Sequence, residues 1–189
     1  MRWVFLNLLR IDPIPASLAH LAPNSQYTEW ITNVRVKKHG LGQTFRVIVF
    51  LGTFDQDPTT WDTEFNVVGR VTVLGRSPKT RCEKCQDDMA NDLIVTGTVS
   101  LTSALIQDCV GGELHSLEQA DVVPHLKRNL QWRVTLFDGI EHPVDQVPGL
   151  QVSVCSTKVT IGGDGLPVYS HEYTTHEDIT HGRPGGLAA

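Results

Sequence analysis

The sequence has no long hydrophobic run, no strong excess of charge and no common nucleotide-binding motif, and each absence excludes a class of protein. No apolar stretch of the 189 residues approaches the roughly 20 that span a bilayer, so no membrane-spanning helix is expected. The net charge is −5 and no basic patch extends beyond a pair such as Lys37-Lys38, which argues against nucleic-acid binding. The sequence also contains no P-loop, dinucleotide fingerprint or nucleophile elbow.

Cysteine is scarce, and glycosylation sequons are absent. The four cysteines are Cys82, Cys85, Cys109 and Cys155. They are too few and too scattered for a disulfide scaffold, so reduced thiols are expected. The N-terminal residues 1–10 look superficially like a signal peptide, but the apolar core is short and is interrupted by Asn7 and Arg10. We therefore expect a cytoplasmic or otherwise intracellular protein that this segment does not direct to secretion.

The composition fits one soluble domain, because 40% of the residues are hydrophobic and 20% are charged. The prolines of residues 1–26 rule out a long helix and predict a lead-in strap or interdomain linker. Residues 27–183 form the expected domain, and residues 184–189 the expected flexible tail.

Alternating or continuous apolar stretches, separated by turn residues, predict about seven strands. The clearest lie at residues 27–37, 45–51, 66–74, 92–101, 131–137 and 150–161. The stretch 45–51 is predicted to be a central strand covered on both faces, and 66–74 a buried strand. Asp138-Gly139 is the strongest hairpin signal.

Helical signals are few. We expect one helix at residues 121–130, capped by Asp121 with Pro124 in its first turn, and a short helix at 103–107 capped by Thr102. The predicted fold class is therefore mainly β, an antiparallel β-sandwich or barrel with one or two short helices.

The local arrangement with the clearest chemistry is Cys82-Glu-Lys-Cys85, on a polar, basic loop after the strand that ends at Val73-Leu74. Two thiols at this spacing can share a soft metal ion or form a disulfide. They supply two of the four ligands that structural zinc needs, whereas two thiolates suit Cu(I). Metal handling, a disulfide and ordinary loop cysteines all stay open.

Other polar residues are interpreted as structural. His171, His176 and His181 recur every five residues, which alternates faces in a strand, so they are expected to be solvated or to contact a missing partner. Glu118 and Asp121 are interpreted as helix-start charges and not as an acid–base pair. The expected core anchors are Trp30, Trp61 and Trp132.

Several motifs, taken in order, resemble the C-terminal domain of fungal tyrosinases over residues 27–183. The matching stretches are 27–42, 45–52, 68–73, Cys82-x-x-Cys85, 99–105, 121–134, 166–169 and 180–183. The resemblance implies a β-sandwich similar to the hemocyanin C-terminal domain. In that family the domain covers the mouth of a helical type-3 copper domain and keeps the proenzyme latent until it is cleaved or displaced.

The resemblance also implies roles for particular residues. Cys82 and Cys85 match the pair that is implicated in copper loading. The side chain that plugs the substrate pocket, commonly aromatic, falls near Val73-Leu74, where phenylalanine is expected. Leu74 is smaller and cannot stack over a substrate site.

The catalytic residues of that family are missing from this sequence. A type-3 copper centre needs six imidazoles on a helical core, and none of the eight histidines pairs with another at helical spacing. The resemblance thus implies a domain without activity of its own, whose partner is a helical copper domain in the same precursor or on a separate chain.

Two alternatives remain from the sequence. The chain could be the smaller fragment of a hemocyanin-like enzyme of secondary metabolism, with copper or zinc in the partner and oxidative or lyase chemistry. It could also be a stand-alone β-sandwich interaction module.

Overall fold

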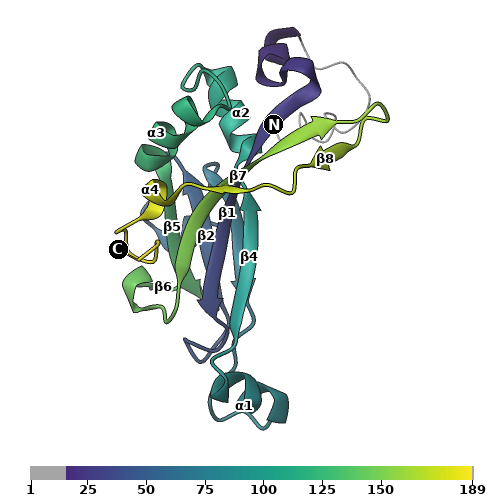
Figure 1. Ribbon diagram of the computed structural model, residues 1–189. Helices are drawn as coiled ribbons and strands as arrows, with labels where there is room; N and C mark the ends of the chain where they lie inside the picture. The colour runs from purple at the N-terminus through teal and green to yellow at the C-terminus, as the bar shows by residue number, and fades with distance from the viewer. Residues whose placement is uncertain (1–15, 189) are drawn as a thin grey trace.

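A computed structural model of the protein describes residues 16–188 as two β-sheets, with α2 and α3 at one end of them and α1 at the opposite end (Figure 1). The strands are β1 (Gln26–Lys37), β2 (Phe45–Leu51), β3 (Val67–Val73), β4 (Ile94–Ser100), β5 (Leu130–Leu136), β6 (Glu141–His142), β7 (Gln151–Ile161), β8 (Pro167–Tyr169) and β9 (Thr174–Thr175). The α-helices are α1 (Glu83–Ala90), α2 (Thr102–Gly111), α3 (Gln119–Asn129) and α4 (Glu177–Thr180). Short 3-10 helices lie at η1 (Ala16–Leu21), η2 (Pro23–Ser25), η3 (Pro58–Thr60) and η4 (Val144–Gln146).

Every strand pair in residues 16–188 is antiparallel. One sheet has the order β4-β1-β7-β8, with β9 also pairing β7, and the other has the order β3-β2-β5-β6. Seven of the nine strands are three residues or longer. The predicted mainly β, antiparallel sandwich is confirmed, but residues 16–188 contain four α-helices where one or two short helices were predicted. None of the helices described in residues 16–188 has the length and hydropathy of a membrane span.

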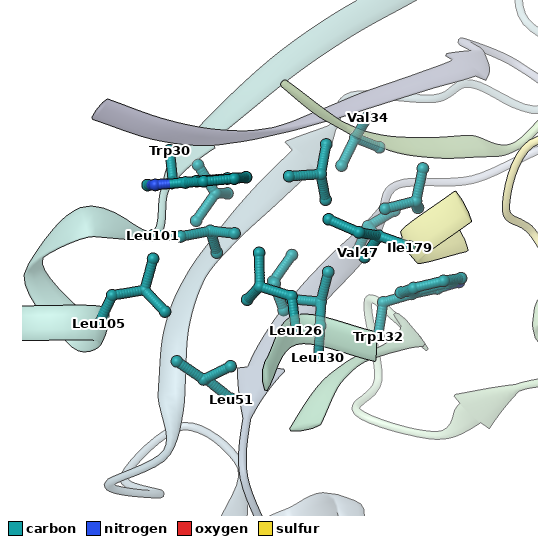
Figure 2. Close-up of a cluster of buried hydrophobic side chains, with 14 of the residues drawn as sticks. Trp30, Val34, Val47, Leu51, Leu101, Leu105, Leu126, Leu130, Trp132 and Ile179 are labelled. Carbon is teal, nitrogen blue, oxygen red and sulfur yellow. The ribbon is translucent and has the colours of Figure 1, made fainter. Parts of the chain in front are cut away.

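The core lies between the sheets because each inner strand turns every second side chain inward. In β1 the buried side chains recur at alternate positions from Trp30 to Val36, and in β2 the alternate residues Phe45, Val47, Val49 and Leu51 belong to this core. Helices α2 and α3 add Leu105 and Leu126 at one end of this layer (Figure 2). The tryptophans Trp30, Trp61 and Trp132 are at most 3% exposed, so their predicted role as core anchors is confirmed.

The outer face of β2 has a second, smaller cluster. Ile48 and Phe50 pack there beneath Trp61, which belongs to the loop between β2 and β3. Phe54 stacks on Phe50 with ring centroids 3.9 Å apart, and the Trp61 indole N–H donates to the Asp55 carbonyl over 2.7 Å. Strand β2 is therefore covered on both faces, as its nearly continuous apolar sequence predicts.

Strand β3 was predicted to be buried, and this is wrong because it is the edge strand of its sheet. Val73 is its one fully buried residue. It packs against β4, the edge strand of the other sheet, through two reciprocal glycine–valine contacts. A Cβ on Gly97 would lie 2.5 Å from Cγ1 of Val71, and a Cβ on Gly69 would lie 2.6 Å from Cγ1 of Val99. The two glycines let the edges of the sandwich approach closely.

The expected loose tail at 184–189 is wrong for the part that the structure describes. The indole N–H of Trp132 donates to the Pro184 carbonyl over 3.0 Å, and the Val152 N–H donates to the Gly185 carbonyl over 2.8 Å. The Arg183 guanidinium lies 4.3 Å from the Trp132 ring centroid. One side-chain and one backbone hydrogen bond, each to a different sheet, thus fix a segment that composition alone marks as flexible.

The predicted lead-in at residues 1–26 lies partly outside the described residues, since 1–15 are not described. Residues 16–25 form η1 and η2, and Leu21 is buried against the core. Strand β1 then starts at Gln26, one residue before the predicted domain boundary.

Three details of the helix prediction are wrong. Helix α2 begins at Thr102, whose hydroxyl does not cap the helix but accepts the Trp30 N–H over 2.8 Å. Helix α3 begins at Gln119, because the N–H groups of residues 121 and 122 both donate to the Glu118 carbonyl. Pro124 therefore sits in the second turn, where it cannot donate to the Ala120 carbonyl.

Candidate functional site

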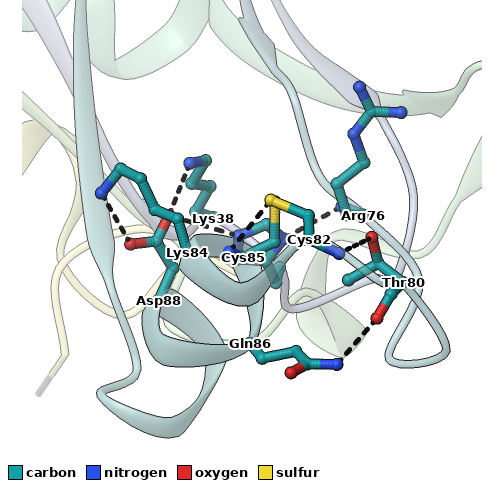
Figure 3. Close-up of a disulfide and its surroundings, with 9 residues drawn as sticks. Lys38, Arg76, Thr80, Cys82, Lys84, Cys85, Gln86 and Asp88 are labelled. Carbon is teal, nitrogen blue, oxygen red and sulfur yellow. Dashed lines mark hydrogen bonds and ion pairs between the residues drawn. A yellow bond between two sulfur atoms is a disulfide. The ribbon is translucent and has the colours of Figure 1, made fainter.

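The cysteine pair lies on a helix and not on a loop. After β3 the chain leaves the sheet and forms α1, for which Cys82 is the N-cap residue (Figure 3). The Cys85 N–H donates to Cys82 Sγ over 3.3 Å, and Cys82 N–H donates to Thr80 Oγ1 over 3.3 Å. Gln86 returns to the same turn by donating to the Thr80 carbonyl over 2.8 Å. These bonds hold the two cysteines together at the first turn of α1.

Cys82 and Cys85 are joined as a disulfide, with their Cα atoms 5.2 Å apart. Cys82 is exposed and Cys85 is half-buried, so a small reductant can reach the bond. Of the three possibilities left open by the sequence, the structure shows the disulfide, so the expectation of reduced thiols is wrong for this pair. The other two cysteines, Cys109 and Cys155, are free thiols, and burial raises the pKa of each.

Helix α1 is anchored by a buried carboxylate. Asp88 accepts a hydrogen bond from Lys38 over 2.8 Å and another from Lys84 over 3.4 Å (Figure 3). The hydrogen bond from Lys38 holds the pKa of the Asp88 carboxyl below its usual range. Lys38 follows β1 directly, so this pair ties the disulfide helix to the five-stranded sheet.

The loop between β3 and α1 is anchored by His39. Its side chain is 5% exposed, and Nδ1 accepts the backbone N–H of Arg76 over 3.0 Å. Its Nε2 lies 3.8 Å from Asp88 Oδ2. Arg76 is two residues after Leu74, so the contact fixes the segment that follows the predicted plug.

The residues of the site fit transient copper binding only in the reduced state. Sulfurs that share a disulfide offer no thiolate to a metal, whereas the reduced pair would offer two soft ligands, which suit Cu(I). In residues 16–188 no group of three or more His, Cys, Asp or Glu side chains is placed to hold a metal ion. A type-3 copper centre does not fit the described residues.

The two residues at the predicted plug position face different ways. Val73 is 2% exposed and belongs to the core, whereas Leu74 is 68% exposed. Only Leu74 can reach a partner. Across β2, the end of β5 presents Phe137, which is 73% exposed. Phe137 was not predicted from the sequence as a site residue, although an aromatic residue beside the Asp138-Gly139 turn is a signal that could have identified it.

The tail histidines do not converge, as predicted, but one of them is not solvated. His176 is 4% exposed, and its Nε2 lies 2.8 Å from the hydroxyl of Ser156. Its ring packs against the Trp30 ring, with centroids 4.6 Å apart and planes tilted by 31°, and burial lowers the pKa of the imidazole. His171 and His181 are exposed. His176 is a core residue because it directly follows β9, whose pairing with β7 brings it to Ser156 and Trp30.

Glu118 and Asp121 both lie at the start of α3, where their negative charge suits the helix dipole. Glu118 pairs with Lys158 over 3.1 Å, and Asp121 accepts a hydrogen bond from Ser116 over 2.6 Å. Each carboxylate has its own structural partner.

Comparison with known proteins identifies the family. The sequence profile of the tyrosinase C-terminal domain matches residues 29–154. A tyrosinase of Neurospora crassa is 63% identical over 174 residues, which cover 92% of this chain and 25% of that protein. A tyrosinase of Podospora anserina is 54% identical over 114 residues, which cover 58% of this chain and 20% of that protein.

Among solved structures, recombinant mushroom tyrosinase has a similar fold, with a TM-score of 0.56 and 18% identity over 82% of this chain and 25% of that chain. The chain thus spans about a quarter of the length of the Neurospora crassa and mushroom tyrosinases. The protein belongs to the tyrosinase C-terminal domain family.

Proposed function

We propose that this chain is the noncatalytic C-terminal domain of a tyrosinase and covers the metal site of a helical copper domain until it is cleaved or displaced. The observation that supports it is the family match over residues 29–154, together with a 63% identical tyrosinase of which the chain spans 25%. The rest of such a protein would supply the copper ligands and the catalytic residues. The relatives are tyrosinases, so nothing favours a zinc-dependent lyase or a stand-alone module.

The proposal includes copper handling by Cys82 and Cys85. A thiol reductant supplies two electrons and two protons to the disulfide, is itself oxidised to a disulfide, and leaves two cysteine thiols on α1. Cu(I) then replaces the thiol protons and is held by two sulfurs, a coordination that soft, low-coordinate Cu(I) accepts. The first turn of α1 keeps the two sulfurs close enough for this role.

The intracellular location and the domain boundaries at residues 26 and 183 stay predictions from the sequence. A cytosolic setting would favour reduction of exposed disulfides and thus the copper-binding form of the pair. The location would be measured with a fluorescent fusion of the whole precursor.

Latency is tested with a chimeric precursor. This chain replaces the matching quarter of the Neurospora crassa tyrosinase, and a protease site is placed before it. We expect the uncut precursor to oxidise catechol at roughly one tenth of the rate of the cut protein or less, because a covered site excludes substrate. Equal rates before and after cutting would contradict the covering function.

Copper handling is tested by anaerobic Cu(I) titration of the reduced chain. We expect about one equivalent to bind, and binding to be lost in the Cys82→Ser/Cys85→Ser double variant. The oxidised chain is the matched control and should bind no more than the double variant. If the reduced chain also binds no more than that variant, the copper role is wrong, while the covering function would still stand.

A further inference from the structure

Three apolar side chains at one end of the four-stranded sheet are exposed to solvent. Leu74 is 68% exposed, Phe137 is 73% exposed and Ile140 is 61% exposed. We call these three residues the apolar tip. Large apolar residues that gather on a surface mark interaction sites more often than isolated ones do.

The strand register brings the tip residues together. Phe45 of β2 pairs with Val73 of β3 on one side and with Leu136 of β5 on the other. Because β3 and β5 both run antiparallel to β2, they run in the same direction and leave the sheet at the same end. Leu74 and Phe137, the next residue of each strand, therefore flank the start of β2, about 10 Å apart across two strand spacings.

Both side chains project from the outer face of the sheet. Val73 and Leu136 are on the inner side, as their packing with the core shows. Neighbouring residues of a strand point to opposite faces, so Leu74 and Phe137 turn away from the core. Their high exposure agrees with this orientation.

The hairpin between β5 and β6 holds its part of the tip in a fixed shape. The Leu136 N–H donates to the Ile140 carbonyl over 2.9 Å, and the Gly139 N–H donates to the Leu136 carbonyl over 3.0 Å. The Asp138 carboxylate accepts the Ile140 N–H over 3.1 Å, and Gly139 has the positive φ of 85° that this turn requires. A side chain on such a preorganised turn loses little freedom when a partner covers it.

On the other side, the segment after Leu74 is fixed by two contacts. The Thr44 hydroxyl lies 3.5 Å from the Gly75 carbonyl, and His39 accepts the Arg76 N–H over 3.0 Å. A Cβ on Gly75 would lie 2.1 Å from the Gln43 carbonyl oxygen, so only glycine allows this close approach. The backbone on both sides of β2 is therefore held in place beneath the exposed side chains.

We propose that the apolar tip is the surface that docks on the helical copper domain, and that Phe137 supplies the aromatic contact that Val73 and Leu74 cannot make. This inference rests on the proposed function and names its contact surface. The occupant is that domain because the chain spans only 25% of its tyrosinase relative, so most of that protein lies outside this structure. An exposed aromatic on a rigid turn has the properties of an interface anchor.

The sheet offers a matched control residue. Phe65 is 83% exposed and precedes the start of β3, so it lies at the opposite end of that strand from Leu74. It has the same side chain as Phe137 and comparable exposure, but it lies outside the tip. Neither residue supports the core, so replacing either with aspartate should leave the fold intact, which thermal unfolding of each variant checks.

The experiment uses the uncut chimeric precursor with Phe137→Asp, Phe137→Leu or Phe65→Asp. We expect Phe137→Asp to raise catechol oxidation by the uncut protein roughly tenfold, since burying the new charge at the interface opposes closure. Phe137→Leu keeps an apolar contact and should stay latent, as should Phe65→Asp. The cut proteins should all have the same activity.

The outcomes separate the inference from the proposed function. If the unsubstituted precursor is already fully active, the covering function itself fails. If that precursor is latent and Phe137→Asp is equally latent, the covering function stands and the docking surface is wrong. If Phe137→Asp instead only dissociates a dimer of the isolated chain, as seen by sedimentation, and latency is unchanged, the tip binds a second copy and the inference is also overturned.

Discussion

The two reciprocal glycine–valine contacts between β3 and β4 make a sharp prediction for Gly97→Ala. The new Cβ would lie 2.5 Å from Cγ1 and 2.8 Å from Cγ2 of Val71, closer than any real Cβ contact. Val71 is branched at Cβ and cannot move one methyl group without moving the other. The edges of the two sheets would therefore have to separate.

The magnitude follows from two opposing effects. Overpacking of this kind destabilises the fold by about 1–3 kcal/mol. Replacing glycine by alanine also restricts the unfolded chain, which stabilises the fold by about 0.4–1 kcal/mol. The expected net loss is about 1–2 kcal/mol in the free energy of unfolding. For a chain of this length, that loss lowers the Tm by roughly 2–8 °C.

The assay is urea unfolding followed by circular dichroism, with Gly163→Ala as the control. A Cβ on Gly163 would meet nothing within 4 Å, so this variant should be at least as stable as the parent. In a double-mutant cycle, Val71→Ala should relieve most of the cost of Gly97→Ala, because it removes both clashing methyl groups. If Gly97→Ala alone is as stable as the parent, the close approach of β3 and β4 is wrong.

Three further predictions concern His176, Trp61 and Arg183. Burial lowers the pKa of His176 below its usual 6.5, so as pH falls the unfolded chain takes up the proton first and stability should decline below about pH 6.5. The urea midpoints at pH 7.5 and 5.5 measure this decline, which should be smaller in His176→Gln. Trp61→Ala should cost about 3–5 kcal/mol, because Trp61 is 1% exposed and covers the outer cluster, and unchanged thermal unfolding would contradict that packing. Arg183→Met removes a 2.6 Å hydrogen bond to the Leu130 carbonyl and the contact with Trp132. We therefore expect the free energy of unfolding to fall by about 1–3 kcal/mol and proteolysis near residue 183 to be faster. Equal cleavage rates would show that the C-terminal segment is not fixed there.

Much of the sheet architecture could be predicted because strand patterns are local. Apolar residues at alternate positions give β1 and β7, the continuous apolar run gives the doubly covered β2, and Asp138-Gly139 gives the β5–β6 hairpin. The edge position of β3 could not be predicted, because burial depends on which strands lie beside it and not on its own apolar residues.

The site was harder to predict because its parts come from distant segments. Helix α1 has a polar sequence without apolar periodicity, and it is held by Lys38, far away in the chain. The burial of His176 depends on Trp30 and Ser156, which only the folded sheet brings to it. The cysteine pair was found from its spacing alone, but its disulfide state and the exposure of Phe137 required the structure.

The central claim is that this domain docks on a helical copper domain through the apolar tip. Hydrogen–deuterium exchange of this chain tests it most directly, measured once in the uncut chimeric precursor and once in the cut chain after its separation from the rest of the protein. We predict slower exchange in the uncut protein at residues 74–76 and 136–141, and no difference around Phe65. Equal exchange at the tip in both states, or protection confined to other surfaces, would contradict the account.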